Sequence, residues 1–265
     1  MSPVITDKPE ACHRFDANSG GYARFRPHYP GELVRLLVQR IVAVPAAVGA
    51  LVLDVGCGTG IFTRQLAALL PDTMPILGIE PAARMRELAM AAQSHHRVEY
   101  RDGLAEALPV KAEAARAVTA ATAAHWFDLP KFFTEAARAL VPGGILGIIE
   151  YVRDVEHSAA ADAIEAFLRR EGGPKVYERP DYANKLRTAE AFVLSDMLTH
   201  KVTMPLNLEG FIGLALSSSH ANAVVAKLGA EATRAALAEL GSGLAEPDGT
   251  IRYGYHFQLF VAARQ

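Results

Sequence analysis

The chain has 265 residues, of which 51% are hydrophobic and 21% charged, and its formal net charge is −2. This composition is typical of a globular enzyme, and it excludes the strongly basic surface that holds nucleic acid. No apolar run is long enough to span a membrane, and the N-terminus lacks a signal-peptide core. We therefore expect a cytoplasmic monomer or homodimer without nucleic-acid or membrane partners. Neither Cys12 nor Cys57 has the spacing of a metal ligand, so no metal site is expected.

The first part of the chain alternates predicted strands with predicted helices. An amphipathic helix is expected over residues 32–44. Short buried strands are expected over 51–55, 76–80, 98–101, 117–122 and 145–151, with helices over 61–70, 82–92 and 129–140. This alternation predicts βαβ units and a doubly wound α/β fold, in which helices cover both faces of a mostly parallel sheet.

After residue 151 the alternation changes. Helices are expected over 159–170, 207–216 and 221–240, with a long strand over 193–204 and a last, antiparallel strand over 252–262. These elements complete a sheet of about seven strands. The expected organisation is an N-terminal arm or lid (1–30), a Rossmann-like core (31–151), an embedded substrate-cap insertion (152–191) and the completion of the sheet (192–265).

The loop after the first strand carries the strongest functional signal. Glycines 56, 58 and 60 let the backbone approach a ligand, and the following helix start offers free N–H groups. Ile61 stands where a dinucleotide fingerprint needs glycine, and no Lys-Ser/Thr pair follows as in a P-loop. Asp54, just ahead of the glycines, would repel a pyrophosphate but suits a cationic amino-acid group. The loop therefore favours a nucleoside ligand that carries an amino acid.

Glu80 lies at the end of the second predicted strand, about 20 residues beyond the glycine loop. A carboxylate at this place can accept hydrogen bonds from both hydroxyls of a ribose. The other interpretation is a charge at the start of the next helix. Because Glu80 follows the glycine loop, the ribose interpretation is favoured.

Four segments together resemble class I S-adenosylmethionine (SAM)-dependent methyltransferases, in particular the small-molecule subfamily related to trans-aconitate methyltransferase. These segments are the glycine loop with Glu80, Asp102-Gly-Leu-Ala-Glu-Ala-Leu-Pro109, Ala123-Ala-His-Trp-Phe-Asp128 and Tyr22-Ala-Arg-Phe-Arg-Pro-His-Tyr-Pro30. The resemblance covers about residues 15–150 and implies SAM as cofactor and S-adenosylhomocysteine as product. The cofactor-binding residues it implies are Tyr22, Arg26, Asp54, Gly56, Cys57, Gly58, Glu80, Pro81, Leu104, Ala105 and Ala121.

The resemblance also implies individual roles for these residues. Glu80 would hold the ribose, Leu104 would pack on the adenine and Ala105 would donate a backbone N–H to it. Arg26 would pair with the SAM carboxylate, and Tyr22 would cover the sulfonium or donate to the carboxylate.

Three residues are candidates for catalysis. His125 leaves the fourth predicted strand toward the crevice of the sheet, and an imidazole can accept a proton near neutral pH. A histidine that only braces its loop is the competing interpretation. Tyr177 and His220 are further candidates from the second half of the chain.

The expected function is methyl transfer from SAM to O, N or C of a small-molecule acceptor. One alternative is a SAM lyase or cyclase of the azetidine-2-carboxylate synthase type, which releases methylthioadenosine. The other is a SAM-binding regulator without turnover.

Overall fold

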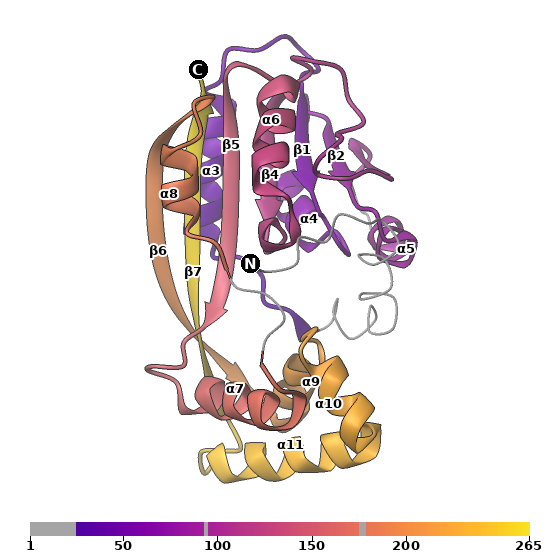
Figure 1. The fold of residues 1–265 in the computed structure, drawn as a ribbon, viewed down its shortest axis with the longest axis vertical. Coiled ribbons are helices and arrows are strands. Elements are labelled where there is room, and N and C mark those ends of the chain that lie inside the picture. The colour runs from indigo at the N-terminus through magenta and orange to yellow at the C-terminus, as the bar shows by residue number, and fades with distance from the viewer. Residues whose placement is uncertain (1–24, 93–94, 175–178) are drawn as a thin grey trace.

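The computed structural model describes residues 25–92, 95–174 and 179–265. Its centre is a seven-stranded sheet with the order β3-β2-β1-β4-β5-β7-β6 (Figure 1). The strands are β1 (Leu51–Val55), β2 (Ile76–Ile79), β3 (Val98–Arg101), β4 (Ala115–Ala121), β5 (Leu140–Arg153), β6 (Phe192–Leu206) and β7 (Ile251–Arg264). The helices of the described residues are α3 (Gly31–Val42), α4 (Ile61–Leu69), α5 (Ala83–Ala91), η1 (Ala124–Trp126), α6 (Leu129–Ala139), α7 (Ala159–Gly172), α8 (Tyr182–Arg187), α9 (Leu208–Leu216), α10 (Ala221–Leu228) and α11 (Ala230–Leu244).

The sheet is mostly parallel, as the sequence predicts. Strand β1 pairs in parallel with β2 and β4, and the parallel ladder continues from β2 to β3 and from β4 to β5. Strand β7 is antiparallel to both of its neighbours, β5 and β6. The predicted α/β class with seven strands is therefore confirmed. The last strand of the chain is inserted inside the sheet, and β6 forms the edge.

Alternate side chains of the central strands enter two separate cores. From β1, Val52 packs in the core beneath α3 and α4, whereas Leu53 packs in the core beneath α6 and α8. Both residues are fully buried, which explains why β1 is a continuous apolar run in the sequence. Burial on both faces also fixes the register, because a slip by one residue would exchange the two sets of side chains.

Two helices differ from the sequence prediction. The helix expected over 221–240 is divided into α10 and α11 at Gly229, whose φ of +84° a continuous helix cannot accommodate. Helix α8 forms where the pattern indicates none. Asp181 caps α8 by accepting a hydrogen bond from the N–H of Asn184, so a local polar contact starts this helix.

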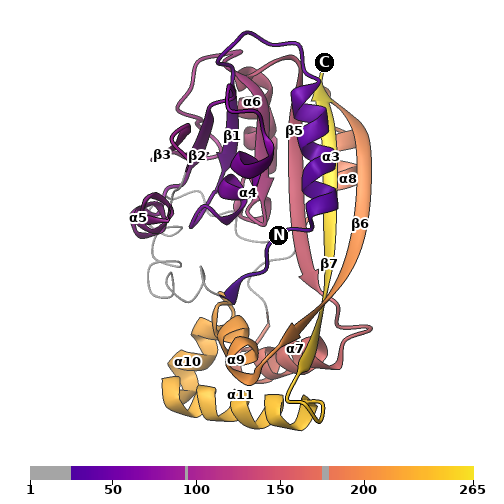
Figure 2. The same ribbon diagram turned by 180° about the vertical axis from the view of Figure 1, so that it is seen from behind.

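Helices α7, α9, α10 and α11 pack together at one end of the sheet, and we call this group the helical lobe (Figures 1 and 2). The lobe combines residues 159–172 with residues 208–244, so it is not confined to the range 152–191 expected for a cap. Helix α8 lies in that range but packs on β6 and β7. The lobe follows the carboxyl end of β5, which is the edge of an open α/β sheet where ligands bind. None of the described helices is both long and apolar enough to cross a bilayer.

Candidate functional site

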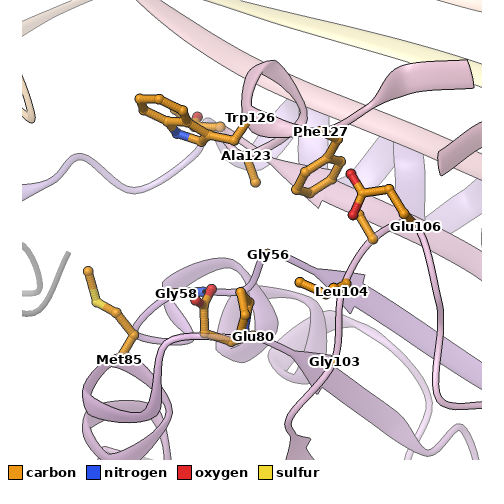
Figure 3. Close-up of a pocket in the computed structure, with 13 residues that line it drawn as sticks. Gly56, Gly58, Glu80, Met85, Gly103, Leu104, Glu106, Ala123, Trp126 and Phe127 are labelled. Carbon is orange, nitrogen blue, oxygen red and sulfur yellow. Dashed lines mark hydrogen bonds between the residues drawn. The ribbon is translucent and has the colours of Figure 1, made fainter. Parts of the chain in front are cut away.

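A cavity with an empty volume of about 780 Å³ lies at the carboxyl ends of β1, β2 and β4 (Figure 3). The loops that follow these strands, together with the loop after β3, form its walls. Six of the residues predicted to bind cofactor line it, namely Gly56, Gly58, Glu80, Pro81, Leu104 and Ala105. Met85, Glu106, Trp126 and Phe127 also line it, although none of them was predicted to bind cofactor; the last three lie in the segments that carry the resemblance. The position of Trp126 and Phe127 just after a central strand is the signal that could have found them.

A second cavity of about 420 Å³ adjoins the first, since Gly56, Gly58 and Thr122 line both. The remaining described residues predicted to bind cofactor line this smaller cavity: Arg26, Asp54, Cys57 and Ala121. Tyr22 lies outside the described residues. The described residues that were predicted to bind cofactor thus line one continuous cleft with two compartments. That this cleft binds the cofactor stays a prediction.

Glu80 organises the boundary between the glycine loop and α5. Its Oε2 accepts the backbone N–H of Gly58 at 2.9 Å, and its Oε1 accepts the N–H of Ala82 at 2.9 Å. Burial raises the pKa of Glu80, and these two hydrogen bonds oppose that effect. Each carboxylate oxygen can accept a second hydrogen bond, so ligand hydroxyls can be held without breaking the loop contacts.

The glycines of the loop serve different purposes. At Gly58, φ is +55° and an added Cβ would meet no atom within 4 Å, so the backbone is open to a ligand there. A Cβ at Gly56 would lie 2.7 Å from Cβ of Ala123, and one at Gly60 would lie 2.4 Å from the hydroxyl of Tyr100. Gly56 and Gly60 are therefore required by packing, whereas Gly58 leaves space beside the cavity.

Acidic and basic groups meet in the smaller compartment. Asp54 is fully buried and accepts hydrogen bonds from the hydroxyls of Thr63 at 2.6 Å and Thr119 at 3.3 Å. Burial raises the pKa of Asp54 to about 7. Arg26 donates to the hydroxyl of Tyr151 and to the carbonyl of Ser217, each at 2.8 Å. A carboxylate and a guanidinium in one compartment suit the ammonium and carboxylate of an amino acid.

Thr122 shows strained backbone where the two compartments meet. Its φ is +49°, an uncommon value for a β-branched residue. The conformation is held by a hydrogen bond from its N–H to the carbonyl of Ile149 at 2.7 Å and by one from the Tyr29 hydroxyl to its Oγ1 at 2.8 Å. Strain that persists under such constraints is typical of ligand sites.

The three candidate catalytic residues are placed differently. His125 lines neither compartment; its Nδ1 lies 3.3 Å from Oε1 of Glu150 on β5. Burial lowers the pKa of His125, with Glu150 opposing, so the imidazole is neutral near pH 7. His220 donates from Nε2 to the carbonyl of Gly173 at 2.8 Å and also lines neither compartment. Tyr177 lies outside the described residues.

Glu150 joins His125 to a second basic residue. It is 1% exposed, pairs with the Arg179 guanidinium, and accepts a hydrogen bond from the Tyr182 hydroxyl at 3.1 Å. Burial favours a raised pKa for Glu150, but Arg179, His125 and Tyr182 together lower it, so Glu150 is a buried carboxylate. Sequence reasoning missed Glu150 because it lies on a different strand from the histidine motif.

A doubly wound sheet with a glycine loop after β1 and an acid at the end of β2 is the arrangement expected of a class I, SAM-dependent methyltransferase. Residues 53–148 match a family described as "Methyltransferase domain". Residues 53–148 are therefore similar to a methyltransferase domain, a family whose cofactor is SAM.

Relatives with curated names agree with this family. An uncharacterized methyltransferase of Mycobacterium tuberculosis is 32% identical over 160 residues, which cover 60% of this chain and 60% of the relative. A malonyl-[acyl-carrier protein] O-methyltransferase of Pectobacterium atrosepticum is 32% identical over 142 residues, or 53% of this chain and 52% of the relative. The chain thus matches only about half to three fifths of these relatives' length.

Two solved structures share the fold. A protein of Anaeromyxobacter dehalogenans, provisionally described as a type II methyltransferase, has a TM-score of 0.67 at 24% identity and covers 89% of this chain and 97% of its own. The [4+2]-cyclase SpnF has a TM-score of 0.61 at 21% identity and covers 99% of this chain and 97% of its own. At these identities the likeness concerns the fold alone, and one fold can host different reactions.

Proposed function

We propose that this chain transfers the methyl group of SAM to an oxygen, nitrogen or carbon atom of a small-molecule acceptor. The observation that carries the proposal is the two-compartment cleft. Its larger compartment has Glu80 for a ribose and apolar walls for an adenine, and its smaller one offers Asp54 and Arg26 to an amino acid. Because the compartments meet at Gly58 and Thr122, a single ligand with both parts can occupy them.

The protein's contribution would be mainly alignment. Bound SAM supplies an electrophilic methyl group, so the chain has to position an acceptor atom and exclude water. The helical lobe lies beyond the carboxyl end of β5 and is tied to this cleft by Arg26, which bonds to Ser217 just after α9. We place the acceptor on the side of the cleft that faces the lobe.

His125 and Glu150 provide a candidate proton acceptor with an orienting carboxylate. When Nδ1–H of His125 donates to Glu150, the basic nitrogen is Nε2. A carboxylate that fixes the tautomer and stabilises the imidazolium is an arrangement used by general bases. We therefore assign His125 the role of base and Glu150 the role of a positioning residue.

The test is to incubate the full chain with SAM and a panel of phenols, amines and carboxylic acids, and to identify products by mass spectrometry. The proposal expects S-adenosylhomocysteine together with a methylated acceptor. Methylthioadenosine without a methylated product would instead show that SAM is cleaved or cyclised. Tight SAM binding with no product from any acceptor would favour a regulator.

The role of His125 is tested with the same assay once an acceptor is found. His125→Ala should lower turnover about 100-fold while leaving the affinity for S-adenosylhomocysteine nearly unchanged. Glu150→Gln should give a smaller loss and shift the pH profile, since it removes the charge that supports the imidazolium. If His125→Ala instead lowers both affinity and stability while turnover per bound cofactor is unchanged, His125 only stabilises its loop.

A further inference from the structure

Three potential metal ligands meet at the junction of the sheet and the helical lobe, outside both compartments of the cleft. They are Asp154 just after β5, His157 just before α7, and His256 on β7. One ligand atom from each lies within 4.8 Å of the other two. About a hundred residues separate His256 from the other two in the sequence, so only the pairing of β5 with β7 brings the set together.

The fold holds two of these side chains in place. Asp154 donates its N–H to the carbonyl of Gly254 at 3.0 Å, and its Oδ1 accepts the N–H of His157 at 3.1 Å. His256 belongs to the β5–β7 ladder, where it faces Val152. The aspartate side chain is 9% exposed, while those of His256 and His157 are 23% and 53% exposed. The cluster is therefore anchored from within and open to solvent on one side.

The contacts of the two histidines are not equivalent. His157 approaches Oδ1 of Asp154 with Nδ1 at 3.0 Å as a hydrogen bond. His256 places Nε2 2.9 Å from Oδ2, yet this buried nitrogen makes no hydrogen bond of acceptable geometry within the described part of the chain. The approach is an ion-pair contact with poor hydrogen-bond alignment, which stabilises a buried nitrogen less than a well-aligned hydrogen bond does. A cation shared between this nitrogen and the carboxylate would satisfy both.

The donor set determines which cation fits. Two imidazole nitrogens and one carboxylate suit Zn²⁺ and similar transition-metal ions, whereas Mg²⁺ and Ca²⁺ prefer oxygen ligands. Zinc ligands lie about 2.0–2.2 Å from the ion, and so about 3.4 Å from one another in a tetrahedron. Nδ1 of His157 lies 3.0 Å from Oδ1 of Asp154, and Nε2 of His256 lies 2.9 Å from Oδ2. These contacts are about 0.4–0.5 Å shorter than that spacing, so the side chains would move slightly apart around an ion. The exposed ring of His157 can rotate to make this adjustment.

Neighbouring charges are compatible with a divalent ion. Glu156 places Oε2 3.9 Å from Nδ1 of His157, and its side chain is 81% exposed, so it can add negative charge or a fourth ligand. Lys201 stands opposite His256 in the β6–β7 ladder, but it is exposed and its charge is screened by water.

We infer that Asp154, His157 and His256 bind a divalent transition-metal ion, best matched by Zn²⁺, that fastens the start of α7 to β7. The site is structural: it would lock the helical lobe onto the sheet at the point where the chain leaves β5. Three protein ligands leave one position for water or for Glu156. The inference is independent of methyl transfer.

The experiment uses the full chain without a histidine tag, after treatment with a chelator. Zn²⁺ should bind with a stoichiometry of about 1:1 in calorimetry and raise the melting temperature, and Co²⁺ should give visible d–d absorption. His256→Gln should abolish these three signals while the protein stays folded, because His256 is partly exposed and the substitution removes only its contact with Asp154 at the rim of the sheet. His200→Gln is the matched control, since His200 lies on the adjacent strand near Glu32.

Several results would overturn the inference. These are the absence of Zn²⁺ binding to the unmodified chain at millimolar concentration, equal binding by His256→Gln, and equal stabilisation by Mg²⁺. Asp154→Asn provides a second variant, which should also lose binding. Because Asp154 also bonds the N–H of His157, its fold must be checked by circular dichroism.

Discussion

The Glu80 side chain both holds the glycine loop in place and provides the proposed contact with the ribose. We expect Glu80→Ala to weaken S-adenosylhomocysteine binding by about 2 kcal/mol, because hydrogen bonds to a charged group are lost. Titration calorimetry measures this affinity. Glu87→Ala is the control, since Glu87 pairs with Arg84 on the exposed side of α5. A folded Glu80→Ala protein with unchanged affinity would contradict the ribose assignment.

Asp54 should make both stability and cofactor binding depend on pH. The pKa of Asp54 is about 7 in the folded protein, which is higher than in an unfolded chain. Protonated Asp54 therefore adds to the free energy of unfolding, and this contribution is fully present below about pH 4. It should be lost as the pH rises through about 7. An ammonium group beside Asp54 favours the carboxylate, so binding should release a proton.

The affinity for S-adenosylhomocysteine should therefore increase between about pH 6 and pH 7.5. Calorimetry in buffers of different ionisation enthalpy counts the protons released. Asp54→Asn should remove most of this dependence. If the unmodified chain and Asp54→Asn show the same pH profile, Asp54 is not beside the ammonium group.

Sequence reasoning correctly places at the cleft those residues whose position depends on their immediate neighbours. Asp54 and Glu80 lie at the ends of predicted strands and Gly58 follows one, and the end of a strand specifies the edge of the sheet. It fails where partners come from different strands. Glu150 beside His125, and Asp154 beside His256, are set by the register of β5 with its neighbours. The positive φ of Thr122 is likewise a product of the packed loop.

At the scale of the element, a glycine in the loop between β1 and α4 can be compared with a glycine in β5 to separate backbone strain from ligand contact. Gly58 and Gly143 both have positive φ, +55° and +73°, and an added Cβ at either meets no atom within 4 Å. Gly143 lies near the start of β5, at the other end of the strand from the cleft. The two positions therefore carry a similar backbone penalty but differ in their distance from the cavity.

We expect Gly58→Val and Gly143→Val to lower the melting temperature to a similar extent. Only Gly58→Val should abolish the binding of S-adenosylhomocysteine, because its branched side chain would occupy space beside the cofactor. Thermal unfolding and calorimetry on the same samples separate the two effects. Normal binding by a folded Gly58→Val protein would exclude the loop as the cofactor site.

The elements themselves could be predicted to different degrees. The strands of the core are short apolar runs bounded by turn residues, so their positions are close to those expected. The division between α10 and α11 depends on Gly229, which has a positive φ. A glycine inside an amphipathic pattern can adopt either a helical or a positive φ, so the pattern alone does not predict the break. Helix α8 is only six residues long and forms because its buried side chains reach β6 and β7.

At the scale of the whole molecule, the segment before α3 fastens the helical lobe to the sheet. A Cβ at Gly213 in α9 would fall 2.4 Å from the Phe25 ring, so the two are closely packed. Arg26 bridges Tyr151 on β5 and the carbonyl of Ser217 after α9. The same guanidinium borders the smaller compartment, which couples the lobe to the proposed cofactor site.

Arg26→Ala should consequently affect two distant properties together. The lobe should open more often, so backbone amides of α9 and α10 should exchange hydrogen faster, while those of α6 remain unchanged. The affinity for S-adenosylhomocysteine should fall by roughly 1.5–3 kcal/mol, the typical value of hydrogen bonds from a charged group. Arg40→Ala is the control, because Arg40 forms a half-exposed pair with Asp196 on the surface, where solvent screening keeps the contribution of an ion pair small. Hydrogen exchange by mass spectrometry measures the opening of the lobe, and titration calorimetry measures the affinity. If Arg26→Ala loses affinity while exchange in the lobe is unaltered, Arg26 contacts the ligand without coupling the lobe to the sheet.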